Sequence, residues 1–225
     1  MEADLAGRLR AETRLLHDQA ERSPFMARLL AGHTDRASYC LLLRNLHPIY
    51  QALEAGAARL SGHHAAIAQL FAPGLARLAA LEADLQFLQG PAWPQTLPVL
   101  PAAAGYGRHL AGMGPAQSHL LAAHAYVRYL GDLAGGQQLR GIVARSLQLP
   151  DAAGTAFYAF GATVHVQRLV QDFRQALNQC TSDATESQDI VAEAQLAFRM
   201  HHALFTELEA ARASAGSGTA SATTR

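Results

Sequence analysis

The chain has 225 residues, of which 50% are hydrophobic, 7% aromatic and 16% charged. Its 18 basic residues are all arginine and are balanced by 18 acidic residues, so the charge indicates neither a nucleic acid nor an acidic membrane surface as a partner. Two cysteines exclude a disulfide framework and a multi-cysteine zinc site. The apolar segments are shorter than a membrane span, and residues 1–14 contain no apolar signal core, so a soluble, cytoplasmic protein is expected.

The abundance of alanine and leucine favours helices, and the spacing of apolar residues predicts them along most of the chain. In chain order, helices are expected over residues 4–22, 25–31, 34–59, 65–89, 115–149, 153–179 and 185–211. Pro48 should kink or divide the third helix, Pro73 should interrupt the fourth, and Asp151 should cap the sixth. Residues 90–101, which hold four of the nine prolines, are expected to form an ordered loop.

No alternating pattern of strand length is present in the sequence. The prediction is therefore an all-α fold with a single domain over residues 1–212. Residues 213–225 are rich in serine, threonine, alanine and glycine, and they are expected to form a disordered polar tail.

The first predicted helix carries an unusual polar face. At helical spacing, Arg10, Arg14 and His17 project within a sector of about 60°, and Glu21 follows His17 by one turn. A histidine that binds a metal usually donates its other N–H to such a carboxylate. The simpler alternative is a solvated helix face with an i,i+4 pair, and spacing alone favours that alternative.

A second unusual feature is the run Tyr126–Gln137, which reads YVRYLGDLAGGQ. Each glycine inside a helix costs roughly 1 kcal/mol relative to alanine, so some other interaction should offset that cost. Gly131 and Gly135 share one face, where the bare backbone could approach a flat ligand, with Asp132 and Arg128 beside it. Close packing against another helix explains the glycines equally well, and the sequence alone leaves both alternatives open.

Together, these residues resemble the haem oxygenase family. The run YVRYLGDLAGGQ is similar to the signature of the family's distal helix, and residues 12–21 are similar to the segment that bears its proximal histidine. Further similar segments follow in order at residues 25–26, 49–54, 157–160, 197–198 and 204–205. The resemblance covers about residues 8–210, nearly the whole chain.

The resemblance implies a helical fold in which haem lies between the first helix and a kinked, glycine-containing distal helix. It implies that His17 is the iron ligand, with Glu21 as the partner of its second ring nitrogen, and that Gly131 and Gly135 bring the distal backbone close to the haem. It also implies that Asp132 anchors a water network that supplies protons. Tyr50 and Arg128 match other members of that network.

The resemblance further implies which residues contact the rest of the haem. Two propionates would be bound by the basic and phenolic side chains Arg10, Arg14, Tyr126 and Arg174. Apolar contacts to the porphyrin would come from Met26, Phe198 and Phe205, for which ordinary core packing is an equally good explanation.

The sequence also departs from the family pattern. Val170 stands at a basic propionate position of mammalian relatives, which leaves Arg174 and Arg168 for that task. His201 stands where those relatives carry an asparagine in the distal water network, and Ala134 replaces the serine of the signature. Altered propionate anchoring can rotate the haem, and this rotation decides which meso carbon is attacked. Cleavage at the α position is the default expectation that the resemblance implies. The polar tail lacks the membrane anchor of eukaryotic members, so the resemblance is to a soluble, bacterial-type enzyme.

The main hypothesis is an enzyme that cleaves haem oxidatively to biliverdin IX-alpha, carbon monoxide and ferrous iron. It would use dioxygen and electrons from a partner such as a ferredoxin or a flavoprotein reductase, since nothing in the sequence resembles a flavin or iron–sulfur site. The alternative is a haem-binding protein of the same fold that stores or delivers haem without cleaving it. A helical interaction module without haem would leave the glycines and the face of Arg10, Arg14 and His17 unexplained.

Overall fold

The structure is a computed structural model that describes residues 4–71, 74–150, 153–181 and 183–220. Its α-helices are α1 (Leu5–Glu21), α2 (Pro24–Leu30), α3 (Arg36–Leu60), α4 (Ala65–Leu70), α5 (Leu78–Gln89), α6 (Trp93–Thr96), α7 (Pro101–Ala111), α8 (Leu121–Ala125), α9 (Gly131–Ser146), α10 (Thr163–Asn178) and α11 (Ala184–Ala220). Short turns of 3₁₀-helix are η1 (Ser61–His63), η2 (Pro115–Leu120) and η4 (Ala156–Tyr158), whereas η3 (Tyr126–Leu130) is π-helical. The described residues contain no strand, which confirms the all-α fold class.

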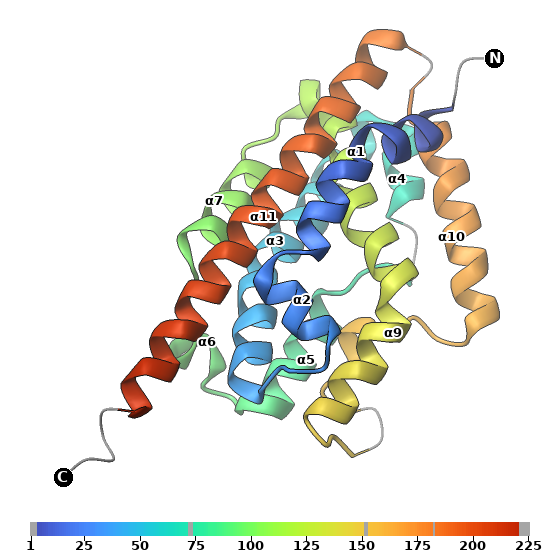
Figure 1. Ribbon diagram of the computed structural model, residues 1–225. Helices are drawn as coiled ribbons and strands as arrows, with labels where there is room; N and C mark the ends of the chain where they lie inside the picture. The colour runs from blue at the N-terminus through green and yellow to red at the C-terminus, as the bar shows by residue number, and fades with distance from the viewer. Residues whose placement is uncertain (1–3, 72–73, 151–152, 182, 221–225) are drawn as a thin grey trace.

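The longest helix, α11, runs along one side of the molecule, and α1 packs against it (Figure 1). Helix α3 packs against α7 and α5. Local sequence defines where the first long helices begin. The Asp4 carboxylate accepts a hydrogen bond from the Gly7 N–H at 2.8 Å, and Asp35 accepts one from the Ser38 N–H at 2.7 Å. Both are N-cap bonds, which satisfy amide groups that the helix itself leaves unpaired.

Pro48 does not divide α3, which continues without a break from Arg36 to Leu60. Gly107 of α7 lies directly against it: a Cβ atom at Gly107 would be 3.1 Å from the Pro48 carbonyl oxygen. The missing Cβ therefore lets α7 approach α3 this closely, because an added one would push the two backbones apart by a few tenths of an ångström. The expected interruption after α4 is confirmed, since α4 ends at Leu70 and α5 begins at Leu78, while Pro73 lies outside the described residues.

The expectation of a loop over residues 90–101 is wrong in part. This segment contains the short helix α6, and α7 begins at Pro101 itself. Proline is tolerated in the first turn of a helix, where its missing N–H has no partner to lose, so these prolines start helices instead of excluding them.

Two other predicted helices are divided in the structure. The helix predicted over 115–149 consists of η2, α8, η3 and α9 in succession. The helix predicted over 153–179 begins only at Thr163, because Gly161 has a left-handed φ of +97° that a continuous helix does not allow. Before it, the Asp84 carboxylate holds the turn η4 by accepting hydrogen bonds from Ala156 N and Phe157 N. Asp151, the predicted cap, lies outside the described residues.

The last helix also extends beyond its predicted end near Ala211. Helix α11 continues to Ala220, so residues 213–220, which were expected in a disordered tail, are helical in the structure. Residues 221–225 lie outside the described part. Within the described residues, no helix is both long and apolar enough to cross a membrane.

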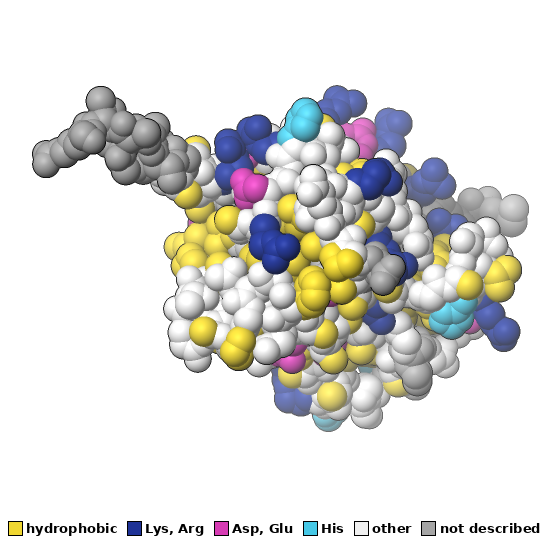
Figure 2. All heavy atoms as spheres, turned by 90° about the horizontal axis from the view of Figure 1, so that it is seen from below, with side chains coloured by type: hydrophobic (Ala, Val, Ile, Leu, Met, Phe, Trp, Pro, Cys, Tyr) yellow, Lys and Arg dark blue, Asp and Glu magenta, His cyan; other side chains and the backbone are white. Residues whose placement is uncertain are grey.

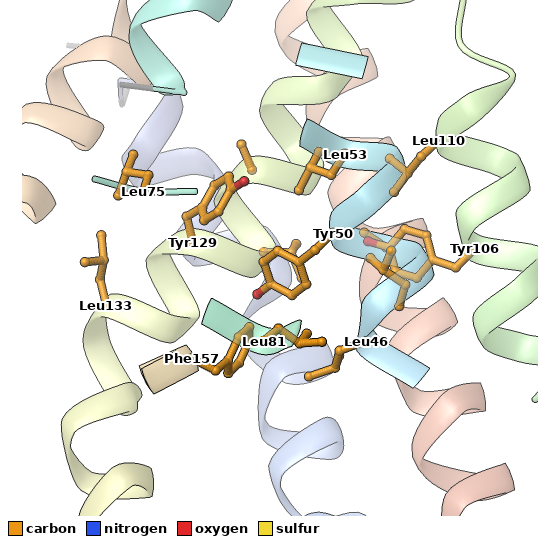
Figure 3. Packing of buried hydrophobic residues seen from close by; sticks show 14 of the residues in the cluster. Leu46, Tyr50, Leu53, Leu75, Leu81, Tyr106, Leu110, Tyr129, Leu133 and Phe157 are labelled. Atoms are coloured by element: carbon orange, nitrogen blue, oxygen red, sulfur yellow. The ribbon is translucent and has the colours of Figure 1, made fainter. Parts of the chain in front are cut away.

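Buried aromatic rings hold the centre of the molecule together. Figure 3 shows Tyr50 extending from α3 towards the helix that carries Tyr129 and Leu133. The ring of Tyr50 contacts Phe157 edge to face at 5.2 Å and Tyr129 at 6.0 Å. On the outside, arginine side chains are scattered over the face drawn in Figure 2 and do not form one basic patch, in keeping with the neutral net charge.

Candidate active site

Two adjoining pockets, of about 170 and 290 Å³, lie between α1, the η3–α9 segment and α11. Both are lined by His17, Val127, Gly131 and Phe198, so they are two halves of one space, called here the α1–α9 cleft. All of the predicted site residues line this cleft except Tyr50, which lies directly behind it. The larger half contains Arg10, Arg14, Tyr126 and Arg174, and the smaller half contains Glu21, Met26, Arg128, Asp132, Gly135 and Phe205.

The glycines of α9 leave open backbone in the cleft. At Gly131 and Gly135, no atom beyond the local backbone lies within 4 Å of the position that a Cβ would take. Gly136, by contrast, faces Tyr158 at 3.5 Å. Close helix packing is therefore the wrong explanation for Gly131 and Gly135, although sequence alone left it open. The π-helical turn η3 directly precedes Gly131, and such turns often mark functional sites.

The His17 side chain reaches the cleft from α1 and is 50% exposed. Its ring meets the Phe198 ring edge to face, with 5.9 Å between centroids. The Nε2 atom lies 3.8 Å from a Glu21 oxygen, and Nδ1 lies 3.8 Å from an Asp18 oxygen. Neither separation is a hydrogen bond. The predicted Glu21 partner is thus on the correct side of the helix but does not hold the ring in this structure.

Behind the glycines, Arg128 and Asp132 form a buried ion pair. Arg128 Nη2 lies 3.0 Å from Asp132 Oδ1, and Arg128 Nε donates to the Tyr50 hydroxyl at 2.9 Å. The Tyr50 hydroxyl in turn donates to the other Asp132 oxygen. The three side chains predicted to share a network therefore make direct hydrogen bonds, and they come from α3, η3 and α9.

Burial and the ion pair shift the pKa values of these groups in opposite directions. Burial raises the pKa of Asp132 above its usual range, with Arg128 and the Tyr50 hydrogen bond opposing that rise. Burial lowers the pKa of Arg128, but Asp132 and Tyr50 outweigh it, so the net shift is upward. Burial also raises the pKa of Tyr50. Arg128 is consequently charged and Tyr50 is neutral and able to donate at neutral pH.

At the other end of the cleft, three arginines carry unpaired positive charge. Arg10, Arg14 and Arg174 are exposed, and within the described part of the chain no carboxylate lies at ion-pair distance from any of them. The Tyr126 hydroxyl beside them is 3.3 Å from Thr13 Oγ1. This arrangement is suited to a ligand with carboxylates at one edge.

The predicted apolar contacts lie both in the cleft and in the core. Phe198 and Phe205 are each 8% exposed, and Phe205 stacks on Phe25 at 6.5 Å. Met26 is half-buried beside them. Core packing and ligand contact, which the sequence left as alternatives, are thus compatible at the same side chains.

Among the aromatic side chains of the cleft, two had no role assigned from sequence. His201 was noted only as a departure from the family pattern, and Tyr158 only as part of a similar segment. Both are buried and line the half that contains Asp132. Tyr158 ends the short turn η4, which an irregular segment separates from α10, so no helical spacing connects it with the other site residues.

The cleft fits a flat ligand with an electrophilic metal at its centre and two carboxylates at one edge. The His17 imidazole is accessible, the Gly131 and Gly135 backbone is bare, the walls are apolar, and the guanidinium groups are unpaired. These are the features that haem requires, so the residues present are consistent with that group.

Comparisons with known proteins agree with this fit. Residues 3–207 match the family model described as "Heme oxygenase". The chain is 36% identical over 210 residues to "Heme oxygenase 1" of Homo sapiens, and the aligned region covers 93% of this chain and 73% of the human protein. It is also 36% identical over 209 residues to "Heme oxygenase 1" of Synechocystis, with 93% of this chain and 86% of that protein covered.

Solved structures give the same result. The crystal structure of heme oxygenase-1 from the cyanobacterium Synechocystis in complex with heme matches with a TM-score of 0.85 and 35% identity, over 97% of this chain and 98% of that one. Heme oxygenase-2 from Synechocystis, in complex with heme and NO, matches with a TM-score of 0.89 and 34% identity, over 95% and 88%. The chain therefore belongs to the haem oxygenase family.

Proposed function

We propose that the protein cleaves haem oxidatively to biliverdin, carbon monoxide and ferrous iron, using dioxygen and electrons from a partner protein. The observation that carries this proposal is the position of Asp132. Its carboxylate lines the same pocket as His17 and the open backbone of Gly131 and Gly135. A protein that only binds haem has no use for a buried carboxyl group there, and burying such a group costs free energy.

The proposed binding mode uses each part of the cleft. His17 would coordinate the iron through a ring nitrogen, and Met26, Phe198 and Phe205 would contact the porphyrin. Arg10, Arg14, Arg174 and Tyr126 would bind the propionates, since guanidinium groups pair well with carboxylates. When bound, haem supplies both the iron that activates dioxygen and the porphyrin edge that is cleaved.

The remaining residues would restrict the position of dioxygen and supply protons. Gly131 and Gly135 would let the backbone lie close over one face, which restricts where dioxygen can sit. Asp132 would hold water at a fixed place in the cleft and pass protons from it. Tyr50 and Arg128 each hold one Asp132 oxygen, so the carboxylate cannot rotate away. The low polarity around this group strengthens those hydrogen bonds.

Three finer parts of the proposal concern product, partner and location. We propose the IX-alpha isomer as product, which is the default that the family resemblance implies, and the arginines at one end of the cleft would fix the rotation of the haem that selects it. A ferredoxin or a flavoprotein reductase would supply the electrons. A cytoplasmic location is supported by the two free, buried cysteines, Cys40 and Cys180, which suit a reducing compartment.

A reconstitution experiment tests the proposal. The protein is mixed with one equivalent of hemin, and the visible spectrum is followed under air with ascorbate, then with a ferredoxin system or a flavoprotein reductase. Loss of the Soret band with formation of biliverdin supports the enzyme. A Soret band that persists with every donor favours the haem storage or delivery protein, and absence of a Soret band contradicts both. Chromatography of the biliverdin isomers tests the IX-alpha assignment separately.

A further inference from the structure

His201 of α11 lies at the back of the α1–α9 cleft and is 2% exposed. Its Nε2 atom is 3.1 Å from Arg128 Nη1, and its Nδ1 atom is 2.9 Å from the Ala197 carbonyl oxygen. A guanidinium group can only donate, and a carbonyl oxygen can only accept. The two partners therefore fix the tautomer: Nδ1 carries the proton, and the Nε2 lone pair faces Arg128.

The surroundings of His201 disfavour a second proton on the ring. Arg128 presents a positive charge to Nε2, Tyr106 of α7 contacts the ring edge at 5.1 Å, and His124 of α8 lies beyond it. On the cleft side, Tyr50 and Asp132 are bound to Arg128 and make no hydrogen bond to His201. Burial, with Arg128 next in importance, lowers the pKa of His201 to about 3. At neutral pH the imidazole is therefore an acceptor.

With this contact, Arg128 is held on three sides. Its Nε donates to Tyr50 of α3, its Nη2 donates to Asp132 of α9, and its Nη1 donates to His201 of α11. Each nitrogen has a different partner on a different helix, so the planar guanidinium has one orientation that satisfies all three.

We propose that His201 is a positioning residue for the reaction, which acts as a neutral acceptor that fixes Arg128 and, through Arg128, the Asp132 carboxylate. The catalytic part of this inference rests on the proposed function. Without an acceptor at position 201, Arg128 keeps two partners and can rotate away from the geometry in which it holds Asp132. Loss of a supporting contact of this kind typically lowers activity by roughly 10–100-fold.

Core packing is the competing explanation, and it makes different predictions. The ring lies 6.1 Å from Phe205 and 5.1 Å from Tyr106, so it also fills space. If space-filling were its only role, phenylalanine would replace it well. If the acceptor is essential, His201→Asn should work better, because a carboxamide oxygen can accept from Arg128 whereas a phenyl ring cannot.

The first experiment uses the haem-free protein and does not depend on the activity. Long-range ¹H–¹⁵N spectra report which ring nitrogen of His201 carries the proton. The proton is expected on Nδ1, with no titration between pH 6 and 8. A proton on Nε2, or a charged ring at pH 6, overturns the proposal. The Arg128 side-chain signals should be exchange-protected in the wild type and lose that protection in His201→Phe.

The second experiment uses the haem complex of the wild type, His201→Phe, His201→Asn and His202→Phe. His202 is the exposed neighbour on α11 and serves as the matched control. Haem affinity and thermal midpoint are compared first, and then biliverdin formation and the pH of the acid–alkaline transition of the ferric complex. Biliverdin formation should fall roughly tenfold in His201→Phe and recover in His201→Asn, with His202→Phe like the wild type.

The outcomes distinguish failure of the positioning role of His201 from failure of the proposed haem cleavage. Wild-type biliverdin formation and an unshifted transition in His201→Phe overturn the positioning role. A wild type that binds haem but forms no biliverdin contradicts the proposed function, while the haem-free spectra still decide whether His201 holds Arg128. If His201→Phe loses its fold, the tautomer in the wild type and the activity of His201→Asn still provide the test.

Discussion

The Tyr50 hydroxyl donates a hydrogen bond to the Asp132 carboxylate, although the two residues are 82 positions apart in the sequence. This bond joins α3 to α9 behind the cleft, and Arg128 completes the contact by binding both residues. An acid in this place is oriented by two donors before any ligand enters. Such prior organisation is what a group that delivers protons requires.

Replacement of Asp132 by asparagine should separate haem binding from haem cleavage. An amide has the same shape but neither the charge nor two equivalent acceptors for Tyr50 and Arg128. Biliverdin formation should fall by at least about 100-fold, the lower end of the usual contribution of a positioned proton-transfer group, while haem affinity stays close to that of the wild type. Spectral titration with hemin followed by single-turnover assays measures both quantities.

Asp172→Asn is the control for this substitution, because Asp172 is 64% exposed on α10 and lies outside the cleft. Biliverdin formation at the wild-type rate in Asp132→Asn would show that Asp132 does not serve in proton delivery.

His17→Ala should remove the iron ligand but leave the pocket walls intact. Haem should still enter the cleft, with a changed Soret maximum and almost no conversion to biliverdin, because the bond from iron to imidazole is absent. Visible and resonance Raman spectra of the hemin complex check the ligand. His33→Ala, at an exposed histidine of the α2–α3 connection, is the control, and retention of the imidazole signature in His17→Ala would remove His17 from this role.

Gly135→Ala should have opposite effects on the empty and the loaded protein. Space around the added Cβ is open, so the haem-free protein should become more stable by up to about 1 kcal/mol through helix propensity. Haem affinity should fall by roughly 1–3 kcal/mol, the usual cost of overpacking. Urea unfolding and hemin titration measure the two effects.

Gly141→Ala provides the matched comparison on the same helix. Its added Cβ would meet only the flexible end of Arg145, at 3.2 Å. Stability should rise there without any change in haem affinity. Equal haem affinities for Gly135→Ala and the wild type would mean that the Gly135 backbone does not approach the haem.

Arg174→Gln should alter the ratio of biliverdin isomers more than it alters haem affinity. Arg174 lies at the cleft, beside Tyr126 and the two arginines of α1, whereas Arg168 lies at a different pocket and is 81% exposed. Arg168→Gln is therefore the control, and chromatography of the products is the measurement. The same isomer ratio in both variants would show that Arg174 does not set the orientation of the haem.

The pH dependence of stability should reveal the neutral state of His201. Its pKa is lowered to about 3 in the folded protein, so between that value and about 6.5 the unfolded chain binds one more proton there. Unfolding free energy should consequently fall as pH drops from 6.5, by about 1.4 kcal/mol per pH unit from this group. The slope should be smaller by that amount in His201→Asn, as urea unfolding between pH 6 and 4.5 would measure.

Much of the site could be predicted because its signals are local. His17, Arg10 and Arg14 share one helix face, and the cost of Gly131 and Gly135 inside a helix can be recognised from sequence. The sequence did not decide between a ligand and a neighbouring helix over those glycines. Only the three-dimensional packing around α9 shows that the space beside them is open.

The predictions that were wrong, or could not be made, depend on contacts between distant segments. The start of α10 at Thr163 depends on the left-handed Gly161 and on the bonds from Asp84 to η4, which helical periodicity does not encode. The role of His201 requires knowing that α11 passes behind Arg128. A π-helical turn such as η3 differs too little in its residue spacing to be distinguished from an α-helix in the sequence.

The most direct test of the account is the yield of carbon monoxide from the one-to-one hemin complex during reduction under air. Carbon monoxide carries the meso carbon that is lost when the porphyrin ring opens, so its yield measures ring cleavage independently of how the spectrum is interpreted. The account predicts one carbon monoxide per haem, together with biliverdin and chelatable ferrous iron. Haem that remains intact, or that bleaches without carbon monoxide, would contradict it.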